Sequence, residues 1–121
     1  LSELLNKGGE LIIEVPSAND ALAVLYESKD FQNFTYWSQH LYLFTAATLS
    51  ELAKQTGLKV AWIKQIQRYP ISNHLYWMAK GKPGGHEKWH FLNDSALHTA
   101  YEKQLAALGL TDTLIAGFTK A

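Results

Sequence analysis

The chain has 121 residues, the length of one domain, and 47% of them are hydrophobic while 18% are charged, which excludes a disordered tail. Eleven basic and eleven acidic residues, with no basic cluster, argue against a nucleic-acid-binding protein, and no apolar run approaches the ~20 residues that span a membrane. The absence of cysteine excludes disulfides and thiolate metal sites, and it fits a reducing, cytoplasmic location.

The first predicted elements are the end of a helix, a strand and a second helix. Three leucines within residues 1–5 have the spacing of a last helical turn, which the glycines at 8–9 would end. The apolar run 11–15 predicts a strand buried on both faces, the kind found in parallel sheets. Residues 17–20 can cap a short helix that runs through residue 29.

An aromatic segment comes next. Residues 31–44 contain many aromatic side chains and follow neither the helical nor the strand period, so we expect a loop or short helical turns over a site. Thr45 is a good N-cap for a helix over residues 46–56, which Gly57 would end.

The rest of the chain alternates strands with helices. Residues 58–68 predict a long strand, with Val60, Trp62 and Ile66 on one side. The later elements are a short helix over 73–80, a loop over 81–85, a helix through 108 capped by Asn93 or Asp94, and a last strand over 111–119. Helices between strands indicate an α/β sheet with crossover connections, within one domain that spans residues 1–121.

The sharpest local pattern runs from His86 through Glu87 to His90 and matches His-Glu-x-x-His. This pattern places two zinc-binding imidazoles one helical turn apart, with the glutamate as a base. The context is poor, because two glycines directly precede His86 and no clear third ligand follows. We therefore expect a polar turn at a helix start and no metal site, with a zinc hydrolase as the weaker alternative.

The candidate site residues lie in two loops that follow predicted strands, where open α/β sheets place ligands. His40 lies among aromatic residues and is the candidate general base, since its ordinary pKa is close to neutral; a histidine that holds the loop is the alternative. Tyr36, Trp37, Tyr69 and His74 are the candidate substrate-binding residues; for Tyr36 and Tyr69 the alternative is simple packing, and for His74 it is a structural role.

Two segments of the chain, one after the other, resemble consecutive segments of a known protein family. The succession from Leu5 to Pro16 resembles class I S-adenosylmethionine-dependent methyltransferases, in which a helix ends at a Lys-Pro-Gly-Gly-like turn before the fifth strand; here Asn6-Lys7 precedes the glycines. His40 to Thr45, followed by Leu49 and Gly57, resembles the family's His-x-x-x-Phe-Ser/Thr entry to a helix that ends in glycine. Sugar and polyketide C-methyltransferases carry a Tyr-His-Glu-His-like run here, of which only His40 is present.

The resemblance implies that residues 58–68 form the sixth strand of a seven-stranded Rossmann-like sheet and residues 111–116 its antiparallel seventh. The chain would be the C-terminal, substrate-side part of such an enzyme, with about three strands and flanking helices. S-adenosylmethionine would bind the other half of the parent enzyme, so we expect no cofactor-binding residue here and no activity of this part alone. The acceptor would be a small molecule or sugar-type compound.

Two further expectations complete the interpretation. A sheet that lacks its other half exposes a strand edge and apolar faces, so we expect a homodimer or higher oligomer. The alternative to an enzyme part is a small non-enzymatic α/β binding or interaction module with an aromatic pocket.

Overall fold

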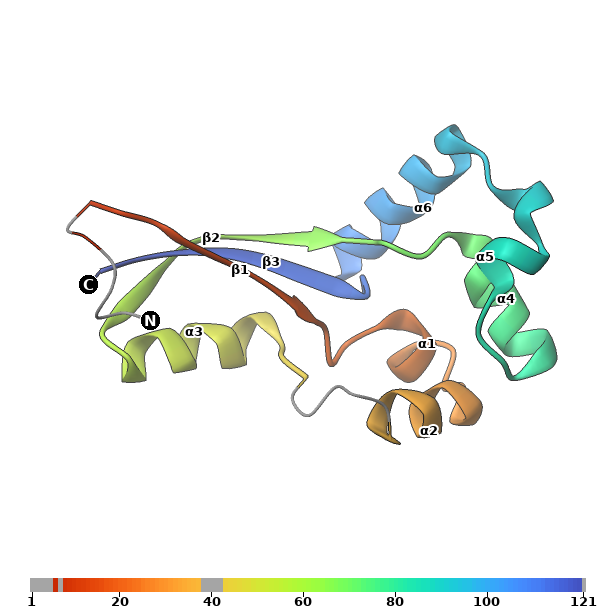
Figure 1. Cartoon of the computed structure of the whole chain (residues 1–121), viewed down its shortest axis with the longest axis horizontal. Helices are drawn as coiled ribbons and strands as arrows, with labels where there is room; N and C mark the ends of the chain where they lie inside the picture. Colours follow the sequence, from red (N-terminus) through yellow and green to blue (C-terminus); the bar gives the residue numbers. More distant parts are fainter. Residues whose placement is uncertain (1–5, 7, 38–42, 121) are drawn as a thin grey trace.

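Three strands form one sheet in the part of the chain that the computed structural model describes, residues 6, 8–37 and 43–120. They are β1 (Leu11–Pro16), β2 (Leu58–Ile66) and β3 (Thr113–Lys120), in the order β1-β3-β2 (Figure 1). β3 is antiparallel to both neighbours, so β1 and β2 run parallel to one another. The prediction of an α/β fold with three strands, an antiparallel last strand and flanking helices is therefore confirmed.

Helices occupy most of the remaining described chain. In chain order they are α1 (Ala21–Val24), α2 (Lys29–Trp37), α3 (Ala46–Gln55), α4 (Ile71–Lys80), α5 (Gly85–Lys88), a 3₁₀ turn (His90–Leu92) and α6 (Ser95–Leu108). α6 has 14 residues, and no helix of the described part has the length and apolar character that a membrane crossing requires.

The predicted helix after β1 is interrupted. Asp20 caps α1 as expected, but the helix ends at Val24 and does not continue through Lys29. Glu27 has a φ of 51°, a left-handed conformation that a helix cannot include, and Ser28 Oγ then accepts a hydrogen bond from Phe31 N at 3.2 Å. The aromatic segment consequently begins within the nine-residue helix α2, in keeping with the short helical turns that were one of the two expectations for it.

Local capping signals set the other helix ends. Thr45 begins α3 with a reciprocal pair of bonds to Thr48, and Asp94 begins α6 by accepting from Leu97 N at 3.0 Å. Gly109 ends α6 in the left-handed conformation, at a φ of 71°. Both helices therefore start at predicted caps.

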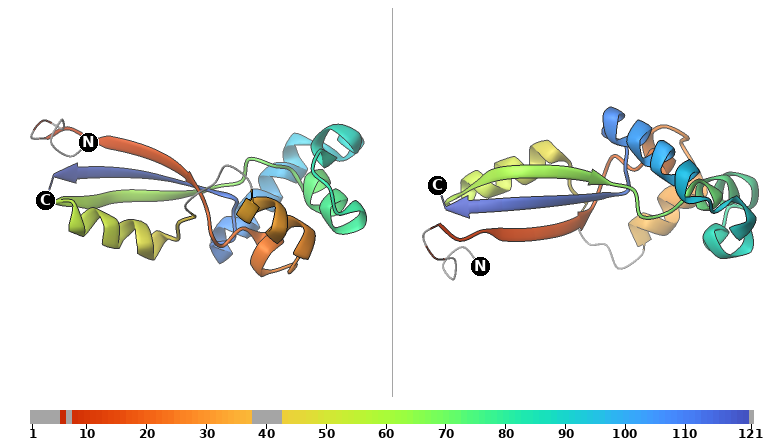
Figure 2. Two further views of the ribbon diagram at one scale, coloured as in Figure 1. Left: turned by 60° about the horizontal axis from the view of Figure 1, so that its bottom comes forward. Right: turned by 90° about the horizontal axis from the view of Figure 1, so that it is seen from above.

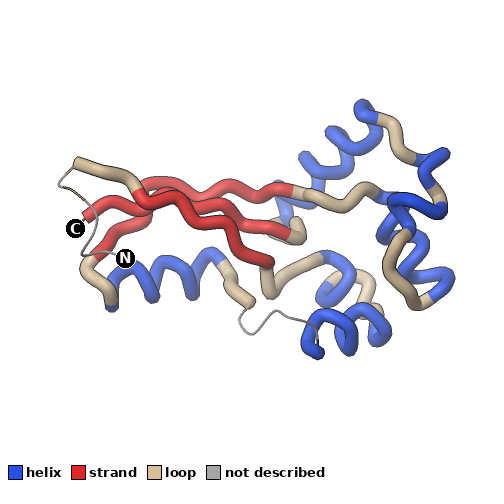
Figure 3. The backbone as a smooth tube through the Cα atoms, in the orientation of Figure 1, coloured by secondary structure: helices blue, strands red, loops and turns tan. Residues whose placement is uncertain are grey.

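The hydrophobic core lies between α3 and one face of the sheet (Figure 2). Its buried members are Leu49, Ala53, Leu58, Leu114, Ala116 and Phe118. The other face carries no helix of the described part along the strands (Figure 3), and Ile12 on that face is 60% exposed. The prediction that β1 is buried on both faces is wrong for this reason.

A bulge in β2 changes which side chains share a face. The register with β3 shifts between Val60 and Trp62, so Val60 packs against the core while Trp62 covers Gly117 on the opposite face. The indole Nε1 of Trp62 donates to Glu10 Oε1 at 3.2 Å. The prediction that Val60 and Trp62 share one face is therefore wrong, because the extra residue reverses the alternation.

The segment between β1 and α3 leaves the sheet and returns to the point where it left. Ala18 N donates to Phe44 O at 2.8 Å, and Ser17 and Phe44 form a parallel bridge. α1 and α2 lie within this excursion. With α4, α5 and α6 they gather beyond the carboxyl ends of β1 and β2 (Figure 1).

Candidate functional site

A pocket of about 390 Å³ opens where β1 and β2 end and β3 begins. Open α/β sheets bind ligands at this edge, beyond the carboxyl ends of their parallel strands. The lining comes from the β1 end, α1, α2, the β2–α4 loop, α4, the α4–α5 loop and the β3 start. Its charged, polar and aromatic lining residues include Glu14, Asp20, Phe31, Phe34, Arg68, Tyr69, Asn73, His74, Trp77, His86 and Asp112.

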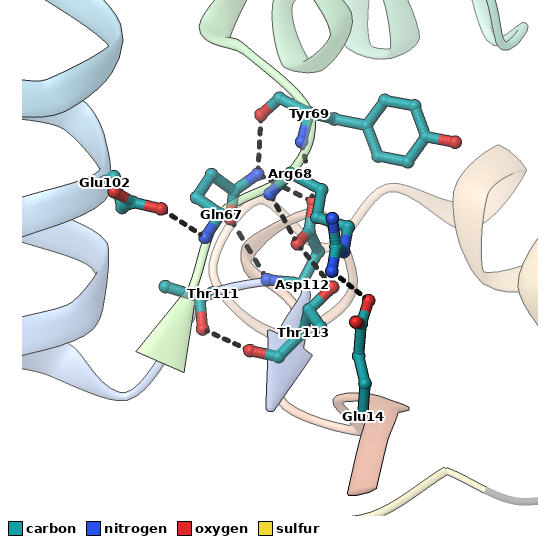
Figure 4. Close-up of polar contacts among 8 residues, drawn as sticks. All are labelled: Glu14, Gln67, Arg68, Tyr69, Glu102, Thr111, Asp112 and Thr113. Atoms are coloured by element: carbon teal, nitrogen blue, oxygen red, sulfur yellow. Dashed lines mark hydrogen bonds and ion pairs between the residues drawn. The ribbon is translucent and has the colours of Figure 1, made fainter. Parts of the chain in front are cut away.

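The Asp112 carboxylate holds the end of β2 against the start of β3 (Figure 4). Its Oδ1 accepts from Arg68 N at 2.9 Å and from Thr113 Oγ1 at 3.0 Å. Its Oδ2 accepts from Tyr69 N at 3.0 Å and from the Gln67 amide at 3.0 Å. Because each oxygen already accepts two hydrogen bonds, we assign Asp112 to holding the loop rather than to binding a ligand.

Gln67 extends this cluster to α6. Its side-chain oxygen accepts from Asp112 N at 3.0 Å, which fixes the amide orientation, and its Nε2 donates to Tyr69 O at 2.7 Å. Its backbone N donates to Glu102 Oε2 at 2.8 Å, and His98 Nε2 donates to its backbone O at 3.0 Å. The loop after β2 is thereby fixed on two sides, which positions Tyr69 at the pocket.

Charges at the pocket edge are partly compensated. Arg68 forms an ion pair with Glu14, across from the end of β2 to β1 (Figure 4). Burial raises the pKa of the Asp112 carboxyl, and the hydrogen bonds from Arg68 N and Tyr69 N oppose this rise. Donors rather than a direct ion pair therefore offset part of the cost of burying the carboxylate.

His74 lies at the centre of a buried hydrogen-bonded chain. Its Nδ1 is 2.6 Å from Tyr101 Oη, which is 2.7 Å from Tyr26 Oη, and its Nε2 is 3.2 Å from Gln67 Nε2. The Gln67 amide nitrogen has two hydrogens, which it donates to Tyr69 O and to Asp112 Oδ2, so its longer contact with His74 Nε2 does not define which ring nitrogen carries the proton. Burial lowers the pKa of His74 to about 4, so the ring is neutral near pH 7.

Removing the Tyr101 hydroxyl tests this chain. We expect Tyr101→Phe to lower the free energy of unfolding by about 2 kcal/mol, because it leaves the buried Nδ1 of His74 without its hydrogen-bond partner. Tyr26→Phe removes only the outer hydroxyl and should cost less than about 1 kcal/mol. Urea denaturation of both variants checks the order, and equal losses would contradict the assignment.

Asp20 is a buried carboxyl at the pocket. Its Oδ1 accepts from Leu22 N at 2.9 Å as the N-cap of α1, and Oδ2 has no hydrogen bond to any residue that the structure describes. Burial, the larger cause, and the like charge of Asp112 raise the pKa of Asp20 to about 7. Asp20 therefore exchanges a proton with solvent near neutral pH, which is the property of a group that can act as an acid or a base.

Aromatic side chains form the apolar wall. Trp77 is 3% exposed, and its ring centre lies 5.3 Å from that of Phe31 and 5.2 Å from that of Phe34. Asn73 is 5% exposed, and its side chain makes no hydrogen bond within the described residues although it lines the pocket. The amide of Asn73 can therefore contact a polar group placed in the pocket.

The structure places two predicted site residues together and leaves the others untested. Tyr69 and His74 both line the pocket, Tyr69 half exposed and His74 buried. The backbones of Tyr36 and Trp37 belong to the end of α2, but their side chains lie outside the described part, as does His40 entirely.

The His-Glu-x-x-His pattern does not form a continuous helix. α5 ends at Lys88, and His90 belongs to the following 3₁₀ turn. Within the described residues, no group of three or more histidine, cysteine and acidic side chains is arranged to hold a metal ion. The pattern is thus divided between two short elements.

Sequence reasoning missed Asp20, Gln67, Asn73 and Asp112 as site residues. Asp20 was interpreted only as a helix cap, and Asp112 only as part of the last strand. Their shared position depends on β3 lying between β1 and β2, for which no local signal exists. The chain matches no protein-family model, no curated protein and no solved structure.

Proposed function

We propose that the chain is the C-terminal, substrate-side part of an S-adenosylmethionine-dependent methyltransferase, with part of a Rossmann-like fold. The observation that carries this proposal is the pocket at the carboxyl ends of two parallel strands with an antiparallel third between them. Parallel fifth and sixth strands with an antiparallel seventh are the directions that the sequence resemblance implies. The acceptor is a small-molecule or sugar-type compound in this pocket.

The neighbouring residues support an acceptor site. In methyl transfer, S-adenosylmethionine supplies an electrophilic methyl group on its sulfonium. The chain's own residues must then align the acceptor and receive its proton. Tyr69 and neutral His74 offer polar contacts next to an apolar wall, and Asp20 can hold a proton. No residue here is assigned to the cofactor, whose contacts would come from the preceding half of the parent enzyme.

A cofactor-binding experiment tests this function. The natural protein, expressed from its complete reading frame, should bind S-adenosylmethionine in calorimetry and transfer its radiolabelled methyl group to a small-molecule fraction. The 121-residue chain alone should do neither. Absence of cofactor binding by the natural protein would refute the proposal.

His40 remains the proposed general base. We expect His40→Ala in the natural enzyme to lower kcat by about 100-fold or more, because a positioned base contributes this much to proton removal. His90→Ala, at an exposed histidine outside the pocket, is the control. An unchanged kcat for His40→Ala would remove the role.

We also propose a homodimer formed through the uncovered sheet face or a strand edge. β1 and β2 are the outer strands of the described sheet, and Ile12 on β1 is exposed on the uncovered face. Ile12→Lys should convert a dimer of the 121-residue chain to a monomer in light scattering, since lysine on an edge strand opposes pairing. Leu108→Lys, equally exposed on α6, should not. A monomeric mass for the unaltered chain at high concentration would contradict the proposal.

The second candidate is a non-enzymatic binding module. The aromatic wall formed by Phe31, Phe34 and Trp77 favours it, because these rings suit a ligand whether or not a reaction follows. Ligand binding by the natural protein without any cofactor binding would select this candidate. The cytoplasmic location is a proposal that rests on the absence of cysteine.

A further inference from the structure

The charges around the pocket favour one sign of ligand. Glu14, Asp20 and Asp112 are its acidic lining residues, whereas Arg68 is the only lysine or arginine in the described lining and is already paired with Glu14. Asp112 already accepts four hydrogen bonds, so Asp20 is the acidic lining residue that a carboxylate or phosphate would meet without compensation. A cation would instead be attracted to Asp20 and would gain from the low dielectric of a partly enclosed site.

Two polar side chains in this pocket have unused capacity. Asp20 is 8% exposed and has one oxygen without a hydrogen bond to the described residues. Asn73 lines the same pocket, and its side-chain amide makes no hydrogen bond to the described residues. An ammonium group can donate to both the Asp20 carboxylate and the Asn73 amide oxygen, which a hydroxyl with its single hydrogen cannot do at once.

The apolar wall defines the rest of the ligand. Phe31 and Phe34 each pack against Trp77 at the pocket, and aromatic side chains of this kind bind flat or ring-shaped bodies. Aromatic faces also attract cations. The aromatic wall and the Asp20 carboxylate together favour a ligand that has a ring next to a positive charge.

We propose that this pocket binds a small ring compound carrying a protonated amine, with the ammonium group at Asp20 and Asn73 and the ring against Phe31, Phe34 and Trp77. The identification of this compound as the methyl acceptor rests on the proposed function. The binding of such a compound to the pocket can be tested without any cofactor.

Three probes that share one ring but carry a positive, a neutral or a negative group test whether the pocket selects for positive charge. The ¹⁵N-labelled 121-residue chain is titrated with benzylamine, benzyl alcohol and benzoate at pH 8, and the amide shifts of pocket residues are followed. Benzylamine should bind about tenfold more tightly than benzyl alcohol, and benzoate should not saturate. Benzoate binding as tightly as benzylamine, or no binding by any probe, would overturn the proposal.

Asp20→Asn and Asp94→Asn form a matched pair, because each aspartate is the N-cap of a helix and asparagine caps equally well. Asp20→Asn should abolish the preference for benzylamine over benzyl alcohol, whereas Asp94→Asn should retain it. Should Asp20→Asn fail to give a dispersed spectrum, Asp20→Ser keeps a capping residue and serves in its place. Retention of the preference without the Asp20 carboxylate would refute the assignment.

The affinity for benzylamine should also rise about fivefold or more between pH 5.5 and pH 8, as Asp20 ionises around its pKa of about 7. Asp112, Tyr101, Glu14, Arg68, His74 and His86 are the other titratable or charged groups that act on Asp20 or line the pocket. The rise should disappear in Asp20→Asn if Asp20 causes it. Methyl transfer plays no part in these titrations, so the proposed function can fail in its calorimetric test while this inference stands.

Discussion

Asp112→Ala is expected to lower the free energy of unfolding by about 3 kcal/mol and to abolish the pocket. The carboxylate accepts hydrogen bonds from the backbones of Arg68 and Tyr69, from the Gln67 amide and from Thr113. Alanine removes all these acceptors at once and leaves the donors of a partly buried loop without partners. Since Tyr69 lines the pocket, its position should be lost together with the stability.

The measurement is a urea denaturation series with a matched control. Asp94→Ala removes an exposed helix-capping carboxylate of the same chain and should cost only about 1 kcal/mol. Asp112→Asn should fall between the two, because it keeps one oxygen but turns an amide toward donors. A loss for Asp112→Ala no larger than that for Asp94→Ala would show that the cluster does not hold the β2 and β3 ends together.

The second large effect is on the free energy of unfolding, which should depend on pH in opposite directions through two buried groups at the pocket. The pKa of Asp20 is raised from 3.8 to about 7, and that of His74 is lowered from 6.5 to about 4, in both cases chiefly by burial. Between pH 3.8 and about 7 the folded state holds a proton on Asp20 that the unfolded chain has lost. Between about pH 4 and pH 6.5 the folded state lacks a proton on His74 that the unfolded chain carries.

The signs follow from which state binds the proton. The stability that Asp20 contributes is complete below pH 3.8 and is lost as the pH rises through about 7. The stability that His74 contributes is complete above pH 6.5 and is lost as the pH falls through about 4. Asp112, whose pKa is also raised, acts in the same direction as Asp20.

Two variants separate these contributions. From pH 4 to pH 7, Asp20→Asn should gain about 3 to 4 kcal/mol of unfolding free energy relative to the unaltered chain. His74→Gln should instead lose about 3 kcal/mol relative to it from pH 4 to pH 6.5. Urea denaturation at half-unit pH steps gives both differences, and differences that do not change with pH would contradict the burial of both groups.

Signals within a few residues made much of the fold predictable. Thr45 and Asp94 each supply a capping side chain beside a helical run, so both helix starts were predicted within a residue. The face assignment of Trp62 failed because a bulge is one extra residue, and nothing local distinguishes it from ordinary alternation. The break at Glu27 was missed for a similar reason, since its backbone conformation has no sequence signature.

The site was less predictable because its members meet only through the sheet. Tyr69 and His74 were candidates because they follow the end of a predicted strand, and both line the pocket. Asp112 and Asp20 are far apart in sequence, and each has an adequate local interpretation as a strand start or a helix cap. The order in which strands pair decides that they face one pocket, and that order depends on contacts between distant segments.

The segment between Ser17 and Phe44 can change near the pocket without changing the sheet, because its two ends are bonded to each other. Substitutions or insertions within it therefore need not displace β1 or α3. Doubling the length of such a loop costs only about 0.6 kcal/mol in closure entropy. Phe31 and Phe34 lie inside it. Changes in this one segment can therefore alter the aromatic side of the pocket while the sheet and its core remain constant.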